Sequence, residues 1–234
     1  MSVSEHPPAR SAWDLFADRT HQQSDHVAII HESRKVTYGQ LYDAAVQISE
    51  HLAARHVLHS DVIPVLARRT PEMIACFLGI LRSGACYVPI DMESWSEDRV
   101  RWTLEETQPR IVVDADGGTL HLAEHAGFQL VSYDEVKAAF IKQDPSGSDR
   151  PLTSIRTPFH VQPTDLAYII FTSGTTSTPK GVMIPHQALL NYVQQGNEDT
   201  PFNGDPRPDD TLLLIFSPGF DGMCHMFIGT VHLS

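Results

Sequence analysis

The chain has 234 residues, of which 41% are hydrophobic and 20% charged, with 14 Gly and 16 Pro, so it is neither a disordered polyelectrolyte nor a collagen-like repeat. Acidic residues outnumber basic ones by 29 to 17, and no basic cluster is longer than two residues, which excludes nucleic acid as an expected partner. No stretch approaches 18 consecutive apolar residues and no signal peptide is visible. We therefore expect no membrane partner and a cytoplasmic location.

The chain begins with strong helix and hairpin signals. Ser11 precedes an amphipathic helix, a polar turn at residues 32–34 separates two short strands, and Thr37 with Gln40 forms a capping-box pattern that begins a second helix. Strands are then predicted at residues 62–66, 86–90, 111–113 and 128–131. Helices between them are predicted from Thr70–Pro71 to Gly84, and from Ser94 as cap, with Glu97 behind it, through Trp102 and Leu104. This alternation predicts an α/β fold with a mostly parallel sheet flanked by helices.

The composition changes in the second half of the chain. Residues 143–163 are rich in Asp, Pro, Ser and Gly, and we predict a surface connection between a first subdomain (1–142) and the start of a second (164–234). Further strands are predicted at 166–171, 182–184 and 211–215, with a helix from about His186. Capping or packing is the expected role of His186.

Residues 172–181, the phosphate loop below, directly follow an apolar strand. The loop holds six hydroxyl residues, two glycines and one lysine in ten positions. Backbone N–H groups and hydroxyls at this density suit a polyphosphate, and a lysine can neutralise charge on its β or γ group. A solvated Ser/Thr-rich turn is the structural alternative, and the spacing is not that of a Walker A loop. The expected phosphate ligands are Thr172, Ser173, Gly174, Thr175, Thr176 and Lys180.

The sequence LAYIIFTSGTTSTPKG at residues 166–181 resembles the phosphate-binding signature of adenylate-forming enzymes. This family includes acyl-CoA synthetases, luciferases and the adenylation domains of nonribosomal peptide synthetases. VTYGQL at 36–41 and LRSGACYVPID at 81–91 resemble two further adenylation-domain motifs in the expected order. The resemblance covers nearly the whole chain and implies the N-terminal part of a large adenylation domain, incomplete at its C-terminus. Ser177 stands where the family usually has glycine, which could weaken phosphate binding if positive φ is needed there.

Residues 216–225, the substrate segment below, carry FSPGFDGMCH. Phe220-Asp221 resembles the Phe-Asp-x-Ser motif whose aspartate receives the α-ammonium of an amino acid, although Met223 replaces the serine. The same alignment implies that Gly222 and His225 line the side-chain pocket. Helix capping by Asp221, turn geometry at Gly222 and a helix-face position for His225 are the structural alternatives.

The remaining cysteines and histidines predict no metal site. Cys76, Cys86 and Cys224 lie in apolar segments without a CxxC pair, so we expect buried, reduced thiols. His121 and His125 could share a helix face, but no third ligand is near in the sequence, and we expect a solvated face.

The resemblance implies an AMP-forming ligase of secondary metabolism. Such an enzyme joins a carboxylate to Mg-ATP to give an acyl-adenylate, and a phosphopantetheine thiol on a carrier domain then captures the acyl group. An amino acid is the expected substrate. A fatty or aryl acyl-CoA synthetase fragment and a non-catalytic remnant are the alternatives. The family's later motifs, including its Mg-coordinating glutamate and its catalytic lid lysine, have no counterpart in these residues. No catalytic residue is therefore assigned, and we expect that the isolated chain cannot complete adenylation at a normal rate.

Overall fold

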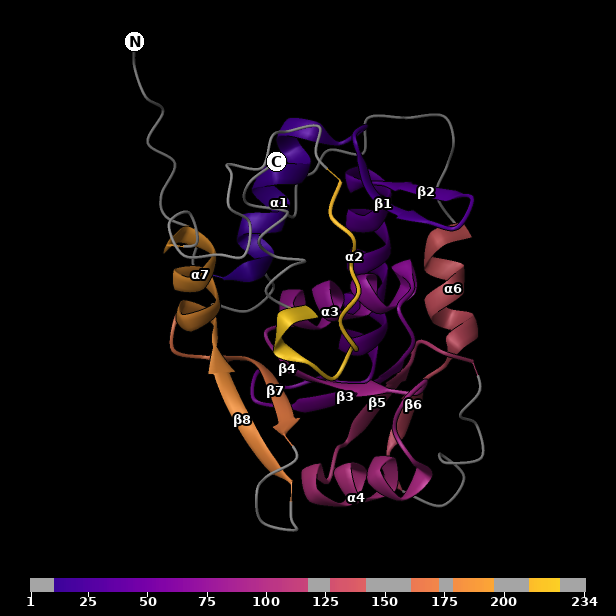
Figure 1. The fold of residues 1–234 in the computed structure, drawn as a ribbon, viewed down its shortest axis with the longest axis vertical. Coiled ribbons are helices and arrows are strands. Elements are labelled where there is room, and N and C mark those ends of the chain that lie inside the picture. Colours follow the sequence, from indigo (N-terminus) through magenta and orange to yellow (C-terminus); the bar gives the residue numbers. More distant parts are fainter. Residues whose placement is uncertain (1–10, 118–126, 142–160, 173–178, 196–210, 224–234) are drawn as a thin grey trace.

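A computed structural model describes residues 11–117, 127–141, 161–172, 179–195 and 211–223 (Figure 1). Its strands are β1 (Val27–His31), β2 (Arg34–Thr37), β3 (Val62–Ala67), β4 (Cys86–Asp91), β5 (Ile111–Asp114), β6 (Gln129–Val131), β7 (Leu166–Thr172) and β8 (Lys180–Pro185). Its helices are α1 (Ala12–Gln23), α2 (Tyr38–Ala54), α3 (Pro71–Ser83), α4 (Glu97–Thr107), α6 (Tyr133–Ile141) and α7 (His186–Gln195).

The main sheet has six strands in the order β6-β5-β3-β4-β7-β8, and β1 and β2 form a separate antiparallel pair. The first four pairings in the main sheet are parallel, and only the β7–β8 pairing is antiparallel. This arrangement confirms the predicted α/β fold with a mostly parallel sheet. Because parallel strands need crossover connections, the helices between them cover both faces of the sheet.

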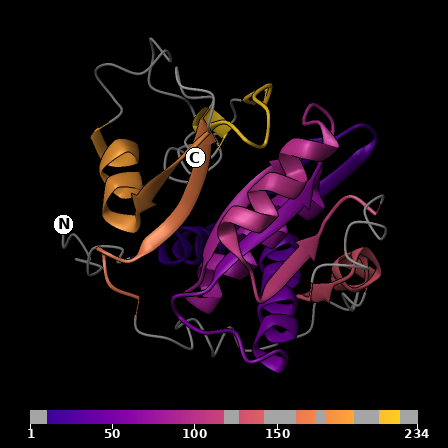
Figure 2. The same ribbon diagram turned by 90° about the horizontal axis from the view of Figure 1, so that it is seen from below.

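Two apolar cores lie on opposite faces of the main sheet. On one face, buried residues of α1, α2, α3 and α6 pack against strand residues such as Val65 and Tyr87. On the other face, Val100 and Leu104 of α4 pack against alternate strand residues such as Val88. The side chains alternate along each strand, so one strand serves both cores. Figure 2 shows α4 on one side of the sheet and the helices of the larger core on the other.

The helix ends follow the predicted signals, with one correction. Capping boxes form at Ser11 and Thr37, Thr70 accepts a hydrogen bond from the Met73 N–H, and Gly84 ends α3 with φ 78°. The predicted cap of α4 was wrong, because Ser96 is the N-cap and accepts from the Arg99 N–H. Ser94 lies three residues before Glu97, the first residue of α4, and its hydroxyl donates to Asp91 Oδ2 at 2.6 Å.

The prediction of a strand at residues 211–215 was also wrong. These residues pair with no strand in the described part of the chain. The Ile215 carbonyl instead accepts a hydrogen bond of 2.9 Å from Arg69 Nη1, so the backbone runs past the strand ends rather than along the sheet. The division of the chain at residues 143–163 stays a prediction, because most of that connection lies outside the described residues.

His186 packs α7 onto α1. Its imidazole is fully buried, and Nδ1 accepts a hydrogen bond of 3.3 Å from the Ala12 N–H. Burial lowers the pKa of His186 to about 4, and nearby Asp165 opposes this change only in part. The imidazole is therefore neutral at pH 7, and the expected packing role is confirmed.

Cys76 and Cys86 are buried free thiols, as predicted. Burial raises the pKa of Cys86 to about 12, and the pKa of Cys76 is raised by burial together with the charges of Glu72 and Asp114. Cys224, His121 and His125 lie outside the described residues. Within the described ranges, no group of three or more His, Cys, Asp or Glu side chains is placed to hold a metal, and no helix is long and apolar enough to cross a membrane.

Candidate nucleotide and substrate site

The phosphate loop is closed at its base by the β7–β8 pair. Thr172, the last residue of β7, stands opposite Lys180, the first residue of β8, and the Thr172 hydroxyl donates to the Lys180 carbonyl at 3.4 Å. Both residues are exposed. The loop residues Ser173, Gly174, Thr175, Thr176 and Ser177 lie outside the described residues, so their contacts with phosphate stay predictions.

The loop begins at the edge of the sheet where the parallel strands end. β4 and β7 are parallel neighbours, and their last residues are Asp91 and Thr172. Their carboxyl ends therefore lie along one edge of the sheet. In open α/β sheets, ligands bind outside this edge. The placement suits a nucleotide whose phosphates lie on the loop.

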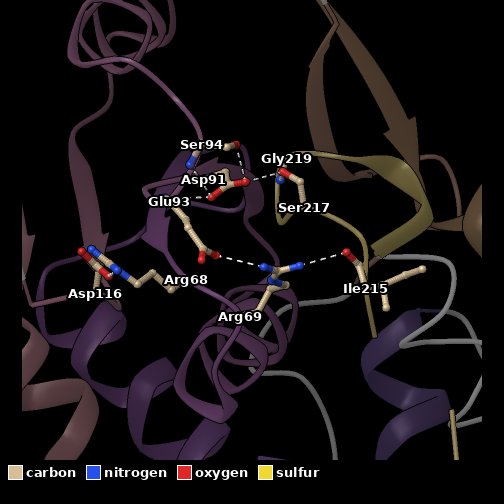
Figure 3. A network of polar contacts seen from close by, with 9 residues as sticks. All are labelled: Arg68, Arg69, Asp91, Glu93, Ser94, Asp116, Ile215, Ser217 and Gly219. Carbon is tan, nitrogen blue, oxygen red and sulfur yellow. Dashed lines mark hydrogen bonds and ion pairs between the residues drawn. The ribbon is translucent and has the colours of Figure 1, made fainter. Parts of the chain in front are cut away.

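Asp91 ties the substrate segment to this edge. Its carboxylate accepts hydrogen bonds from Ser217 Oγ at 2.5 Å, Ser94 Oγ at 2.6 Å, and the backbone N–H groups of Glu93 and Ser94 at 2.9 and 3.3 Å (Figure 3). Asp91 is only 2% exposed, and burial alone would raise its pKa. The four donors outweigh burial and hold the pKa of Asp91 below its ordinary value. The carboxylate is thus an ionised anchor at the end of β4.

Arg69, just after β3, makes a second connection. Its Nη1 donates to the Ile215 carbonyl at 2.9 Å, and its Nη2 donates to Glu93 Oε2 at 3.0 Å. The neighbouring Arg68 points away and pairs with Asp116 beyond the end of β5 (Figure 3). The Arg69 contacts fix the backbone immediately before the substrate segment.

Sequence reasoning missed both anchors: LRSGACYVPID at 81–91, which ends in Asp91, was interpreted only as a marker of the family, and Arg69 lies in no motif that we singled out. A usable signal was present. Asp91 is the carboxylate that follows a buried strand, and polar groups at the carboxyl ends of parallel strands commonly form sites. Its partner Ser217 lies 126 positions away, so spacing could not identify the pair.

The substrate segment is described only as far as residue 223. Asp221 is exposed, begins a helical turn over residues 221–223, and accepts from the Gly222 N–H at 2.8 Å. A Cβ added at Gly222 would stand 3.1 Å from the Phe216 ring and 3.2 Å from the Phe220 ring, and these rings stack 5.4 Å apart. The two aromatic rings thus occupy the space into which a side chain at position 222 would extend. His225 lies outside the described residues.

Comparison with known proteins identifies the family. The model of the AMP-binding enzyme family matches residues 16–233. The chain belongs to this family. It is 36% identical over 218 residues to the nonribosomal peptide synthetase sirP of Leptosphaeria maculans, and 37% identical over 222 residues to tcpP of Claviceps purpurea. These matches cover 93% and 94% of the chain but only 10% of each relative, so the chain spans about a tenth of their length.

Solved structures show the same fold of the AMP-binding family. The nonribosomal peptide synthetase FmoA3, in its form bound to alpha-methyl-L-serine-AMP, matches with a TM-score of 0.79 and 25% identity over 98% of this chain and 24% of that one. The N-terminal subdomain of Klebsiella oxytoca NpsA, in complex with 3-hydroxyanthranilyl-AMSN, matches with a TM-score of 0.73 and 21% identity. That match covers 96% of this chain and 52% of the other, and it concerns the fold alone.

Proposed function

We propose that this chain forms the N-terminal part of an adenylation domain that binds Mg-ATP and activates the carboxylate of an amino acid. Membership of the AMP-binding family and the similarity to nonribosomal peptide synthetases support the proposal. The observation that carries it is the common position of Thr172 and Lys180, at the base of the phosphate loop, and of the described residues of the substrate segment. The base of the loop is fixed at the carboxyl edge of the sheet by the end of β7. The segment is fixed at the same edge by Asp91 at the end of β4.

In the proposed reaction, a carboxylate oxygen of the amino acid attacks the α-phosphorus of ATP. A new P–O bond forms while the bond between the α-phosphorus and the oxygen bridging to the β-phosphate breaks, and pyrophosphate leaves. Lys180 would neutralise charge on the β or γ phosphate, the hydroxyls of the loop would donate to phosphate oxygens, and Asp221 would hold the α-ammonium group. The sulfur of a phosphopantetheine thiol on a carrier domain would then bond to the carbonyl carbon of the aminoacyl-adenylate, lose its proton, and release AMP.

Calorimetric titration with Mg-ATP tests the nucleotide site. We expect the unaltered chain to bind, and Lys180→Ala to bind about 10- to 100-fold more weakly, because a hydrogen bond to a charged group contributes about 1.5–3 kcal/mol. Lys35→Ala is the matched control, since Lys35 is an exposed lysine on β2, in the separate two-stranded sheet. Absence of heat with the unaltered chain, or equal affinity in Lys180→Ala, would contradict the proposal.

The substrate class is tested by titrating the Mg-ATP complex with a panel of amino acids, and in parallel with octanoate and benzoate. We expect binding heat with an amino acid but not with octanoate or benzoate. This heat should be lost in Asp221→Asn, which removes the charge but keeps the size of the side chain. Equal binding of the two amine-free acids would favour the acyl-CoA synthetase alternative. Amino-acid-dependent ATP–pyrophosphate exchange by the isolated chain is expected to be absent or very slow, and a normal rate would refute that expectation.

A further inference from the structure

Arg99 connects helix α4 to the base of the phosphate loop. It lies in the first turn of α4, and its Nη2 donates to the carbonyl of Phe171 at 3.1 Å. Phe171 is the residue just before Thr172 in β7. The Arg99 guanidinium carbon also stands 3.7 Å from the centre of the Trp95 ring, a cation–π contact. One side chain thus contacts both the end of β7 and the turn before α4.

Trp95 in turn contacts the substrate segment. A Cβ added at Gly219 would lie 2.7 Å from Trp95 Cζ2 and 3.1 Å from Cε2, so the indole edge leaves no room for a side chain there. The backbone N–H of Trp95 donates to the backbone carbonyl of Asp91 at 3.0 Å, which fixes the backbone of the tryptophan to the end of β4. The ring is therefore held between Arg99 and Gly219.

The four residues Phe171, Arg99, Trp95 and Gly219 form a continuous line of contacts, here called the Trp95–Arg99 bridge. Both central side chains are half-buried, and Trp95 also packs against the smaller core that α4 covers. The nearby Asp91 carboxylate raises the pKa of Arg99, although burial lowers it more. Asp91 also holds Ser217, so one carboxylate supports the bridge and the segment together.

We propose that Arg99 is a positioning residue which, through Trp95, couples the base of the phosphate loop, at the end of β7, to the described part of the substrate segment. Binding of a polyphosphate at the loop would reduce the motion of the end of β7. Through the contacts of the bridge, it would also reduce the motion of residues 216–221. Neither family membership nor any predicted site residue assigns this role. The part that concerns nucleotide rests on the proposed function, whereas the mechanical connection can be measured without a ligand.

Hydrogen–deuterium exchange of the ligand-free chain tests the connection. We expect Arg99→Ala to speed exchange at least about fivefold in peptides from residues 166–172 and also from 215–223. Ser217→Ala should affect only the second peptide. Arg101→Ala is the matched control, because this exposed arginine of the same helix pairs with Glu97 at the surface, and it should change neither peptide. Unchanged exchange at 215–223 in Arg99→Ala would overturn the proposal.

A second variant separates coupling from a loss of stability. Arg99→Lys keeps the charge and a donor but not the planar group, so both peptides should exchange at intermediate rates, while peptides from α2 and α3 stay as in the unaltered chain. Faster exchange throughout the chain, in Arg99→Ala and Arg99→Lys alike, would mean a structural role only and would overturn the proposal. If Arg99→Ala does not fold, Arg99→Lys decides the question by the same two peptides.

The nucleotide arm uses Mg-ATP as the probe. We expect Mg-ATP to slow exchange at 180–185 and at 215–223 in the unaltered chain, whereas in Arg99→Lys the slowing at 180–185 should be kept and that at 215–223 reduced. Equal protection of 215–223 in both proteins would overturn the coupling. If Mg-ATP protects neither region in the unaltered chain, the proposed function fails, while the ligand-free comparison still decides whether the bridge connects the two segments.

Discussion

Acid should destabilise this protein through His186. The imidazole is fully buried at the start of α7, accepts the Ala12 N–H, and has no hydrogen-bond partner at Nε2 among the described residues. Burial is the main cause that lowers its pKa to about 4; Asp165 opposes the change and His59 adds to it. Protonation would place a charge in a buried position, where the nearby Asp165 offsets only part of the lost hydration.

The sign and size of the effect follow from the two pKa values. In the unfolded chain His186 takes up a proton below about pH 6.5, whereas in the folded chain it does so only near pH 4. The unfolded state therefore binds more protons between these values, and stability falls as the pH is lowered through this range. One pKa unit corresponds to about 1.4 kcal/mol, so the full loss is about 3 kcal/mol, and about 2 kcal/mol is lost by pH 5.

Urea unfolding of the unaltered chain and of His186→Asn, at pH 7.5 and pH 5, measures this effect. The asparagine amide oxygen can still accept the Ala12 N–H, but it does not titrate. We expect the unaltered chain to lose about 2 kcal/mol more than the variant over this interval, because other titrating groups cancel in the comparison. His59→Asn, which removes a more exposed histidine paired with Asp165, should retain the pH dependence. Equal losses in the unaltered chain and His186→Asn would refute the reasoning.

Three further predictions concern the core and the anchor. Gly79→Ala should lower the unfolding free energy by about 1–3 kcal/mol, because the new Cβ would stand 2.8 Å from the Ala45 carbonyl oxygen. This loss should exceed the gain from the better helix propensity of alanine. Thermal melts measure the effect, and an unchanged or higher melting temperature would contradict it. Asp91→Asn should lower the unfolding free energy by about 1–3 kcal/mol at pH 7. The difference between variant and unaltered chain should shrink as the pH falls through the lowered pKa of Asp91, because protonation removes the same charge. A constant difference down to pH 3 would argue against an ionised anchor. Cys76 and Cys86 should resist iodoacetamide until urea unfolds the chain, as judged by mass spectrometry of their peptides, because burial raises both thiol pKa values; rapid labelling of the folded protein would contradict their burial.

Local signals were sufficient to predict most of the fold. The Thr37–Gln40 capping box and the glycine at Gly84 act within one helical turn, so they can be recognised from neighbouring residues. The cap of α4 could not be chosen this way, since Ser94 and Ser96 are equally good caps by residue type. The choice depends on where the helix begins, and the structure starts it at Glu97, directly after Ser96. The strand predicted at 211–215 failed because strand formation needs a partner, and an apolar run alone does not supply one.

The site was predicted less completely than the fold. The motif at 172–181 indicated the loop, and the structure adds that its base is a strand pair between Thr172 and Lys180. The contacts that hold the loop base and the substrate segment in place join residues far apart in the chain. Arg99 and Phe171 are 72 positions apart, and no local pattern relates them. Such pairs arise from the strand order, which places β4 next to β7.

The strand pair at the base of the phosphate loop also affects the entropy of ligand binding. Joining the two ends of a flexible stretch as long as residues 173–179 costs about 2 kcal/mol of chain entropy. Folding has already met this cost, because Thr172 and Lys180 are paired in the sheet. A ligand bound at the loop therefore does not have to bring the two ends of the loop together. By the same reasoning, substitutions that weaken the β7–β8 pair should reduce affinity even where they touch no ligand atom.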